Sequence, residues 1–254
     1  MLCQHILAQA DRLSGVCALI DADHMFNPLY AEQCGVALDE LYLAQPTTAE
    51  QAFDMAERLA RSAAFAVVVI DSLTGLIPQE ELAAPYGTPV SSNLDHLLAR
   101  WLPQLNSAIH HTQTALILTD QTKTGVSRVY HELENHLSRI ALPLTASLRL
   151  RLETISAPLT TQEIRRIRVQ GVKNKFAPCF KSVTLDIIVN RGINKIGEIL
   201  DLGVESGTLS RQGSGYFYQG KRLGATRQET SDVLGRSPQL ADELERVIRL
   251  KMRC

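Results

Sequence analysis

The sequence lacks two features that identify many protein classes at first sight: a long hydrophobic run and an excess of charge of one sign. No apolar stretch reaches the roughly 18 residues of a membrane-spanning helix, so the sequence predicts no membrane span. The 26 Lys and Arg residues almost balance the 27 Asp and Glu residues, which gives a formal net charge of -1. The overall charge therefore does not indicate nucleic-acid binding, and any basic surface has to be local.

Cysteine is scarce and scattered. Five cysteines are spread over the 254 residues and none belongs to a C-x-x-C pair, so the sequence predicts neither a disulfide framework nor a zinc knuckle. We expect reduced thiols in a cytoplasmic protein, and residues 1–10 lack the basic leader of a signal peptide. Hydrophobic residues make up 45% and charged residues 21% of the chain. These proportions exclude a disordered, collagen-like or coiled-coil chain.

Short apolar runs alternate with helix-like patterns in the first half of the chain. Three such runs predict buried strands, at residues 16–21, 65–71 and 114–119. Helical patterns cover residues 1–12, 47–62 and 94–110, and the first of them has no capping residue before it. Thr47 and Glu50 have the spacing of a capping box at the start of the second helix. The alternation predicts an α/β fold with a mostly parallel sheet and helices on both faces.

The pattern changes after residue 121. Residues 146–153 and 163–172 alternate apolar and charged side chains, as half-exposed antiparallel strands do. A composition shift near residue 190 predicts a small α/β appendage after it. Within that appendage, a hairpin is expected to turn at Gln219-Gly220, with Phe217 packed inward and the flanking tyrosines facing outward.

Polar residues follow each of the three predicted buried strands: Asp21-Ala22-Asp23-His24, Asp71-Ser72 and Asp120-Gln121. In a parallel sheet, ligands bind at the carboxyl ends of the strands. An acid that follows apolar β residues holds Mg²⁺ in many ATPases, although Asp is also a common turn residue. Three such ends in one sheet favour a nucleotide site.

Seven stretches of the sequence together resemble the bacterial RecA recombinase family. They are CALIDADH (17–24), NPLYAEQCGV (27–36), QPTTAEQA (45–52), AVVVIDSLTGLIP (66–78), LTDQ (118–121), VKNKFAPCFK (172–181) and GINKIGEILDLGV (192–204). The resemblance implies a RecA-like P-loop NTPase core over 1–190 and a small α/β C-terminal domain over 191–254. It also implies the family function, which is an ATP-dependent filament on single-stranded DNA that carries out strand exchange in recombination and repair.

The resemblance assigns roles around ATP and Mg²⁺ to four residues at the strand ends and beside them. Asp71 matches the acid that supports the Mg²⁺, and Tyr30 matches the aromatic residue that stacks on adenine. Asp23 stands where the family has the glutamate that activates the attacking water, and it is shorter by one methylene. Gln121 matches the glutamine that senses the γ-phosphate.

Three further residues match positions that act outside the protomer's own nucleotide site. Lys173 and Lys175 resemble a pair that reaches into the ATP site of a neighbouring RecA-like protomer, which implies a homo- or hetero-oligomer. Arg149 matches a basic residue near the DNA-binding loops. These three residues therefore connect the chain to its expected partners, other protomers and single-stranded DNA.

The sequence departs from the family pattern at the phosphate loop. No G-x-x-x-x-G-K-[ST] motif, and no Gly-Lys-Ser/Thr, occurs in the printed residues. That loop cradles phosphates with backbone N–H groups and a helix N-terminus, so the chain is expected to bind ATP poorly by itself. The strand that precedes the loop in the family is also missing, and we expect a gap with unpaired edges in the sheet.

Both expected DNA-binding loops depart from the family pattern as well. Residues 85–92 replace a Gly-rich first loop, and residues 130–139 are acidic and helix-like where the family has a Thr- and Gly-rich loop. Basic residues are concentrated over 163–181 instead, where six of them oppose a single glutamate. This stretch is either a solvated edge or a contact with DNA or another protomer.

Three interpretations follow. The chain is a truncated copy of an ordinary RecA ATPase, or a diverged paralog without ATPase activity that caps or modulates filaments through protein contacts. A non-catalytic nucleic-acid-binding module is the third. The retained Lys173 and Lys175 and the altered loops favour the paralog.

Overall fold

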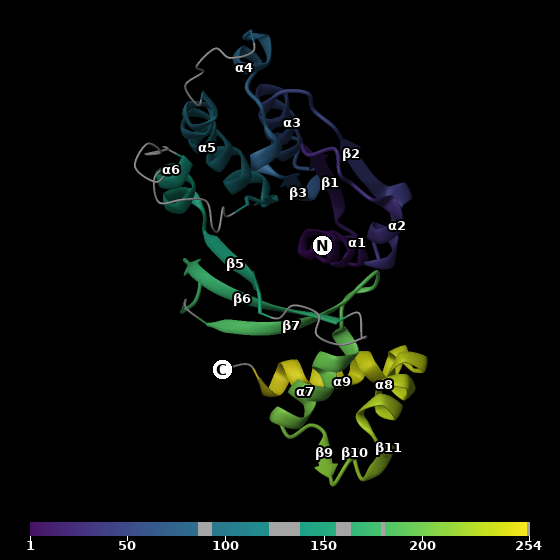
Figure 1. Ribbon diagram of the computed structural model, residues 1–254. Helices are drawn as coiled ribbons and strands as arrows, with labels where there is room; N and C mark the ends of the chain where they lie inside the picture. Colours follow the sequence, from purple (N-terminus) through teal and green to yellow (C-terminus); the bar gives the residue numbers. More distant parts are fainter. Residues whose placement is uncertain (86–92, 122–137, 156–163, 179–180, 253–254) are drawn as a thin grey trace. The chain divides into compact units, whose positions relative to one another are not determined.

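The computed structural model describes residues 1–85, 93–121, 138–155, 164–178 and 181–252, and the chain forms two compact units (Figure 1). Unit 1 consists of residues 1–149 with 172–179, and unit 2 of residues 150–171 with 180–254. The division at residue 190 that we derived from the sequence stays a prediction.

A four-stranded parallel sheet forms the centre of unit 1. Its strands are β1 (Val16–Asp21), β2 (Leu41–Ala44), β3 (Phe65–Asp71) and β4 (Ala115–Leu118), in the order β2-β1-β3-β4. The three strands predicted from the apolar runs are confirmed, and β1 and β3 are largely buried. The expected burial is wrong for β4, in which no residue is buried. Among the described strands β4 lies at one edge of this sheet, and β5 (Leu148–Thr154) lies at an edge of a separate sheet, so the expected gap with unpaired edges stays a prediction.

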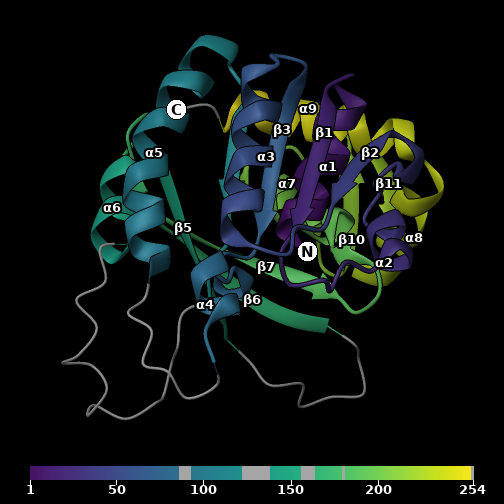
Figure 2. The ribbon, with the colours of Figure 1, turned by 90° about the horizontal axis from the view of Figure 1, so that it is seen from above.

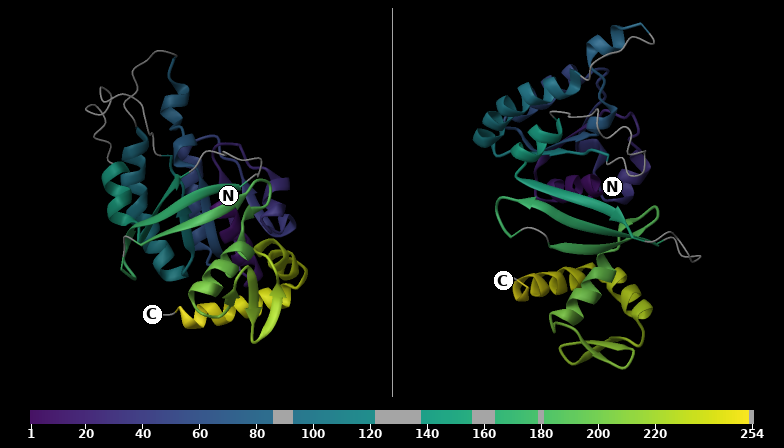
Figure 3. Two further views of the ribbon diagram at one scale, coloured as in Figure 1. Left: turned by 60° about the horizontal axis from the view of Figure 1, so that its bottom comes forward. Right: turned by 60° about the vertical axis from the view of Figure 1, so that its left-hand side comes forward.

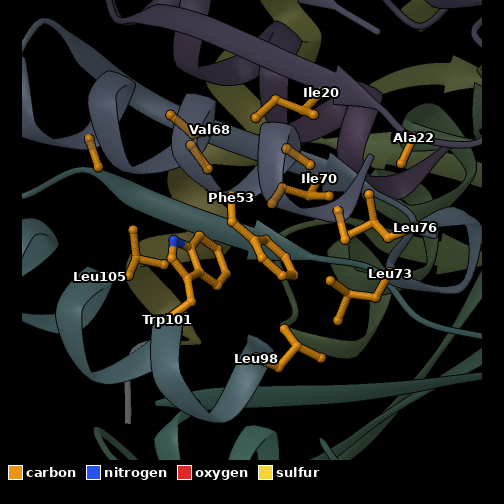
Figure 4. Close-up of a cluster of buried hydrophobic side chains, with 14 of the residues drawn as sticks. Ile20, Ala22, Phe53, Val68, Ile70, Leu73, Leu76, Leu98, Trp101 and Leu105 are labelled. Atoms are coloured by element: carbon orange, nitrogen blue, oxygen red, sulfur yellow. The ribbon is translucent and has the colours of Figure 1, made fainter. Parts of the chain in front are cut away.

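One face of this sheet carries a cluster of buried side chains (Figure 4). Ile20 of β1 and Ile70 of β3 point toward it, and both are fully buried. The helices α3 (Ala49–Arg61) and α5 (Asn93–Thr112) cover this face, as Figure 2 shows. Phe53 of α3 and Trp101 of α5 stack with ring centroids 4.4 Å apart, which joins the two helices through an aromatic contact.

The opposite face is covered by α1 (Leu2–Arg12) and α2 (Pro28–Gln33). Alternate residues of the strands, such as Leu19 and Val69, pack here against Leu7, because successive side chains of a strand point to opposite faces. Asn27 caps α2 by accepting a hydrogen bond from the Tyr30 N–H. The central strands β1 and β3 are therefore buried on both faces, as is typical of a parallel sheet.

The predicted capping box of α3 is wrong by one residue. Thr48, not Thr47, is the cap, and its hydroxyl accepts from the Gln51 N–H. Gln51 in turn accepts from the N–H of Thr47 at 3.0 Å. Glu50 is then free to accept from the N–H of Gln79, which begins the short helix α4 (Gln79–Ala83).

The antiparallel sheet is formed by β5 (Leu148–Thr154), β6 (Ile164–Asn174), β7 (Ser182–Ile188) and β8 (Gly192–Ile193), with α6 (Ser138–Thr145) preceding β5. The pairs β6–β7 and β7–β8 are antiparallel, as predicted. The expectation of a half-exposed strand is wrong for β5, since every residue in it is exposed. Leu150 and Leu152 each leave 43% of their surface in solvent.

The last part of unit 2, drawn in green to yellow in Figure 3, is a three-stranded sheet with three helices. It comprises α7 (Lys195–Glu205), β9 (Ser210–Gln212), β10 (Gly215–Tyr218), β11 (Lys221–Gly224), α8 (Arg227–Arg236) and α9 (Pro238–Lys251). The hairpin turn at Gln219-Gly220 is confirmed by the positive φ of both residues. The orientation was wrong, because Tyr216 is the buried residue and Phe217 is not part of the core.

Two 3₁₀ turns complete the described elements, at Leu38–Glu40 and Leu73–Gly75. Of the helices that the structure describes, none is long and apolar enough to cross a bilayer.

Candidate functional site

The carboxyl ends of the parallel strands gather the acids that the sequence singled out. Asp21 of β1 and Asp71 of β3 are register partners in neighbouring strands, and Asp120 follows β4. Asp23 lies just beyond β1. We call this set of four acids the strand-end edge. Its existence confirms that the polar residues after the apolar runs meet at one side of the sheet.

Asp21 is a structural acid. It is only 3% exposed, and its carboxylate accepts hydrogen bonds from the N–H groups of Met25 and Phe26, both at 3.1 Å. The side-chain amide of Gln45 donates a third, at 2.9 Å. Asp21 therefore holds the loop between β1 and α2, and it ties that loop to the residue just after β2.

Asp23, at the expected general-base position, turns toward the loop after β3. The hydroxyl of Ser72, a buried residue, donates to its carboxylate at 2.9 Å. Ser72 follows Asp71, to which it is joined by a cis peptide bond. A Cβ on Gly75 would stand 1.9 Å from the Asp23 Oδ1. The Asp23 carboxylate is thus engaged by Ser72 and packed against Gly75, where a larger residue would have to displace it.

Replacing Gly75 by alanine is expected to expel the Asp23 carboxylate and break its bond with Ser72. The new methyl would also lie 3.1 Å from the Ala22 carbonyl oxygen, which leaves the backbone little room. We expect the G75A variant to lose about 1–3 kcal/mol of unfolding free energy, as measured by urea denaturation. Gly207, whose Cβ would meet nothing within 4 Å but whose φ is +64°, provides a control for backbone strain without a clash.

Hydroxyl side chains engage the remaining acids of the edge. The Thr119 hydroxyl donates to Asp71 Oδ1 at 2.6 Å, and the Thr74 hydroxyl donates to Asp120 at 2.9 Å. The exposed Gln121 donates its backbone N–H to Asp120, also at 2.9 Å. Sequence reasoning named Ser72 only as a polar residue after a strand and did not single out Thr74 or Thr119, although Thr119 ends a predicted strand.

Tyr30, matched to the adenine-stacking residue, is half-buried on α2. Burial and a hydrogen-bonding interaction with Cys34 raise the pKa of its phenol. Burial likewise raises the pKa of the Cys34 thiol, while the bond with Tyr30 opposes that rise. Tyr30 is therefore fixed through its hydroxyl to the end of its own helix.

The described hydrogen bonds of Lys173 and Lys175 are to the end of α6 and not to the strand-end acids. Lys173 Nζ donates to the carbonyl oxygens of Pro143 at 2.5 Å and Leu144 at 2.9 Å. Lys175 Nζ donates to the Thr145 carbonyl at 3.3 Å. Partial desolvation and the charges of Lys175 and Arg149 lower the pKa of Lys173, so the three expected partner-facing residues do form one basic cluster.

Most of both expected DNA loops lies outside the described residues, at 86–92 and 122–137. The described residues of the basic run over 163–181 do not decide between a solvated edge and a contact with DNA or another protomer. Arg166 forms a salt bridge with Asp186 across β6 and β7 at 2.8 Å, and this pairing raises its pKa. Arg165 and Arg168 are exposed.

The strand-end edge fits one half of a magnesium-nucleotide site. Magnesium in such sites is held by one or two carboxylates together with substrate phosphates, and Asp71 is a suitable ligand. The phosphate half is different, because the printed residues contain no G-x-x-x-x-G-K-[ST] loop, whose backbone N–H groups and lysine would hold the phosphates. The described residues also hold no group of three His, Cys, Asp or Glu arranged for a metal ion. The printed residues therefore provide an acid that suits the magnesium and no G-x-x-x-x-G-K-[ST] loop for the phosphates.

Comparison with known proteins gives consistent matches over the whole chain. The family model described as "RecA N-terminal domain" matches residues 1–194, and "RecA C-terminal domain" matches residues 197–253. Protein RecA of Roseiflexus castenholzii is 38% identical over 98% of this chain and 71% of its own length. Protein RecA of Chloroflexus aurantiacus is 37% identical over the same shares, and that of Rhodospirillum rubrum is 36% identical over 98% and 68%.

Proposed function

This chain belongs to the RecA family, and on that basis we propose that it acts in homologous recombination and DNA repair without binding ATP by itself. The family forms filaments on single-stranded DNA. We infer that the partners of this chain are RecA-like protomers and single-stranded DNA, in the cytoplasm. Its core and C-terminal domain would divide near residue 190.

A contrast within unit 1 supports this proposal. The strand-end edge concentrates four carboxylates without a described cation to hold phosphates, and the printed sequence contains no phosphate loop. The basic cluster of Lys173, Lys175 and Arg149 is retained. The groups that act on a neighbour's nucleotide are thus present, while those that grip the protomer's own nucleotide are absent from these residues.

A protomer of this kind can contact a neighbour's nucleotide but presents no nucleotide of its own. Its lysines can place positive charge beside phosphates that an adjacent, ATP-binding protomer holds, and charge-assisted hydrogen bonds to phosphate are about twice as strong as neutral ones. Its own strand-end edge offers no bound nucleotide to the next protomer. We therefore propose that it caps or modulates a filament of active RecA.

Adding the purified chain to an active RecA on single-stranded DNA is expected to change the rate of ATP turnover in proportion to the ratio of the two proteins. The Lys173→Ala variant is expected to lose this effect, because it removes one of the two cations offered to the neighbour. Phosphate release measures the rate. Lys221→Ala, which removes an exposed lysine on β11, is the matched control and should behave as the intact chain.

Unchanged turnover with the intact chain and with Lys173→Ala would contradict the proposal. The truncated-ATPase interpretation has its own test, since the nucleotide sequence upstream of the first codon either contains an in-frame G-x-x-x-x-G-K-[ST] or does not. Finding the motif there would replace the paralog by an ordinary RecA.

A further inference from the structure

The contacts of Lys173 and Lys175 describe a helix cap that the sequence does not reveal. The last carbonyl groups of a helix have no partner within it, and those of α6 belong to Pro143, Leu144 and Thr145. Each of the three carbonyl groups accepts one hydrogen bond from a lysine, two of them from Lys173 and one from Lys175. The donors come from the end of β6 and the residue just after it, 30 positions later in the chain.

Strand geometry explains why two lysines reach one helix end. Lys173 is the penultimate residue of β6 and Lys175 directly follows its last residue, and the two-residue spacing suits side chains that leave the chain on the same face. Between them, Asn174 accepts from the N–H groups of Phe176 and Ala177, which ends the strand. The backbone N–H of Lys175 also donates to the Ser147 carbonyl at 2.9 Å, so the lysines are held beside the end of α6.

The electrostatics of this cap favour it in an isolated protomer. The C-terminus of a helix carries a partial negative charge, and cations placed there are stabilising. Two ammonium groups stand at this end, and Arg149 is near enough to lower the pKa of Lys173. Within the described part of the chain, neither lysine forms a salt bridge with a carboxylate. The two ammonium groups thus donate only to neutral carbonyl oxygens among the described contacts.

A phosphate would compete for the same donors. An ammonium has three N–H donors, and Lys173 already uses two of them on carbonyl oxygens. Hydrogen bonds from a cation to an anion are stronger than those to a neutral carbonyl, so a polyphosphate within reach would draw the lysines away. The end of α6 would then lose three of its hydrogen-bond partners at once.

We propose that Lys173 and Lys175 form a two-position switch, holding the C-terminal end of α6 in the free protomer and releasing it when they bind the polyphosphate chain of a nucleotide. The nucleotide is the one presented by a neighbouring protomer, and in this respect the inference rests on the proposed function. Binding of the neighbour's nucleotide thereby removes hydrogen bonds from the C-terminal end of α6.

Hydrogen exchange of the purified chain tests the switch, with backbone amides of residues 144–148 as the probe. The double variant Lys173→Met, Lys175→Met is expected to speed their exchange about tenfold, as loss of a few charge-assisted bonds implies. Sodium tripolyphosphate is expected to produce a similar increase in the intact chain and none in the double variant. Lys181→Met, which removes an exposed lysine of the same basic stretch, should leave these amides as in the intact chain.

An unchanged exchange rate in the double variant would contradict the lysine cap of α6. An unchanged exchange rate in the intact chain after addition of tripolyphosphate would contradict the switch. Release by sodium sulfate at equal ionic strength, or by a single-stranded oligonucleotide in place of tripolyphosphate, would contradict a nucleotide as the ligand. These measurements use the chain alone. A failure of the proposed function, seen as unaltered turnover by active RecA, is therefore distinguishable from a failure of the switch.

Discussion

Titration of the 254-residue chain with ATP and Mg²⁺ is expected to show binding about 10⁴-fold weaker than that of an active RecA. A phosphate loop supplies about four N–H donors, each worth roughly 1.5–3 kcal/mol toward a charged acceptor. Their loss removes at least about 6 kcal/mol, and each 1.4 kcal/mol is a tenfold change in affinity. Isothermal titration calorimetry of both proteins in one buffer provides the comparison.

The strand-end edge adds to this expectation. Asp23, Asp71 and Asp120 are engaged by hydroxyl groups, and no described cation offsets their charge against an incoming triphosphate. Substituting Asp71 by asparagine is therefore expected not to weaken ATP binding further, whereas the same change would do so in a protomer that uses this acid for Mg²⁺. Saturable binding of micromolar ATP that Asp71→Asn abolishes would show that the site is functional.

The Asp21→Ala variant is expected to lose about 3 kcal/mol of unfolding free energy, a large effect for a residue in a cluster that looks like a ligand site. Alanine leaves three donors, the N–H groups of Met25 and Phe26 and the amide of Gln45, without their acceptor. A buried donor that loses its partner costs about 1–3 kcal/mol, and partial access of water reduces the sum. Urea denaturation followed by far-UV circular dichroism measures the change.

Asp120→Ala is the matched comparison. Asp120 is also a strand-end acid, but it is exposed and accepts from Thr74 and from the backbone N–H of Gln121. Because water can replace it as acceptor, we expect a loss below about 1 kcal/mol. Equal losses in the two variants would contradict the division of the strand-end edge into a structural acid and solvated ones.

The parallel sheet could be predicted from the sequence because its central strands are buried on both faces. Such strands appear as continuous apolar runs, and the runs at residues 65–71 and 16–21 end where β3 and β1 end. Elements decided by tertiary contacts were harder. The cap of α3 moved to Thr48 because Gln51 turns back to Thr47, and two adjacent threonines look alike in a sequence.

The sequence predicted which acids gather at the candidate site but not which hydrogen bonds they form. That Asp21 and Asp71 lie side by side follows from parallel pairing. The Asp21 carboxylate accepts hydrogen bonds from Met25, Phe26 and Gln45. These bonds depend on a loop conformation that the hydrophobic periodicity of the sequence does not predict. The placement of Lys173 on the end of α6 is likewise a contact between distant segments. Tyr216 escaped prediction because alternation along a strand gives two faces without saying which is buried.

The two kinds of strand pairing described above imply different folding speeds. In unit 1, Ile20 pairs with Ile70 and Ile70 with Leu118, so the sheet closes only after long stretches of chain have been brought together. In unit 2, Tyr218 pairs with Lys221 and Phe217 with Ser210, which are nearby in the chain. Local pairings form faster than distant ones. The small C-terminal sheet should therefore form its native strand pairs before the central sheet does.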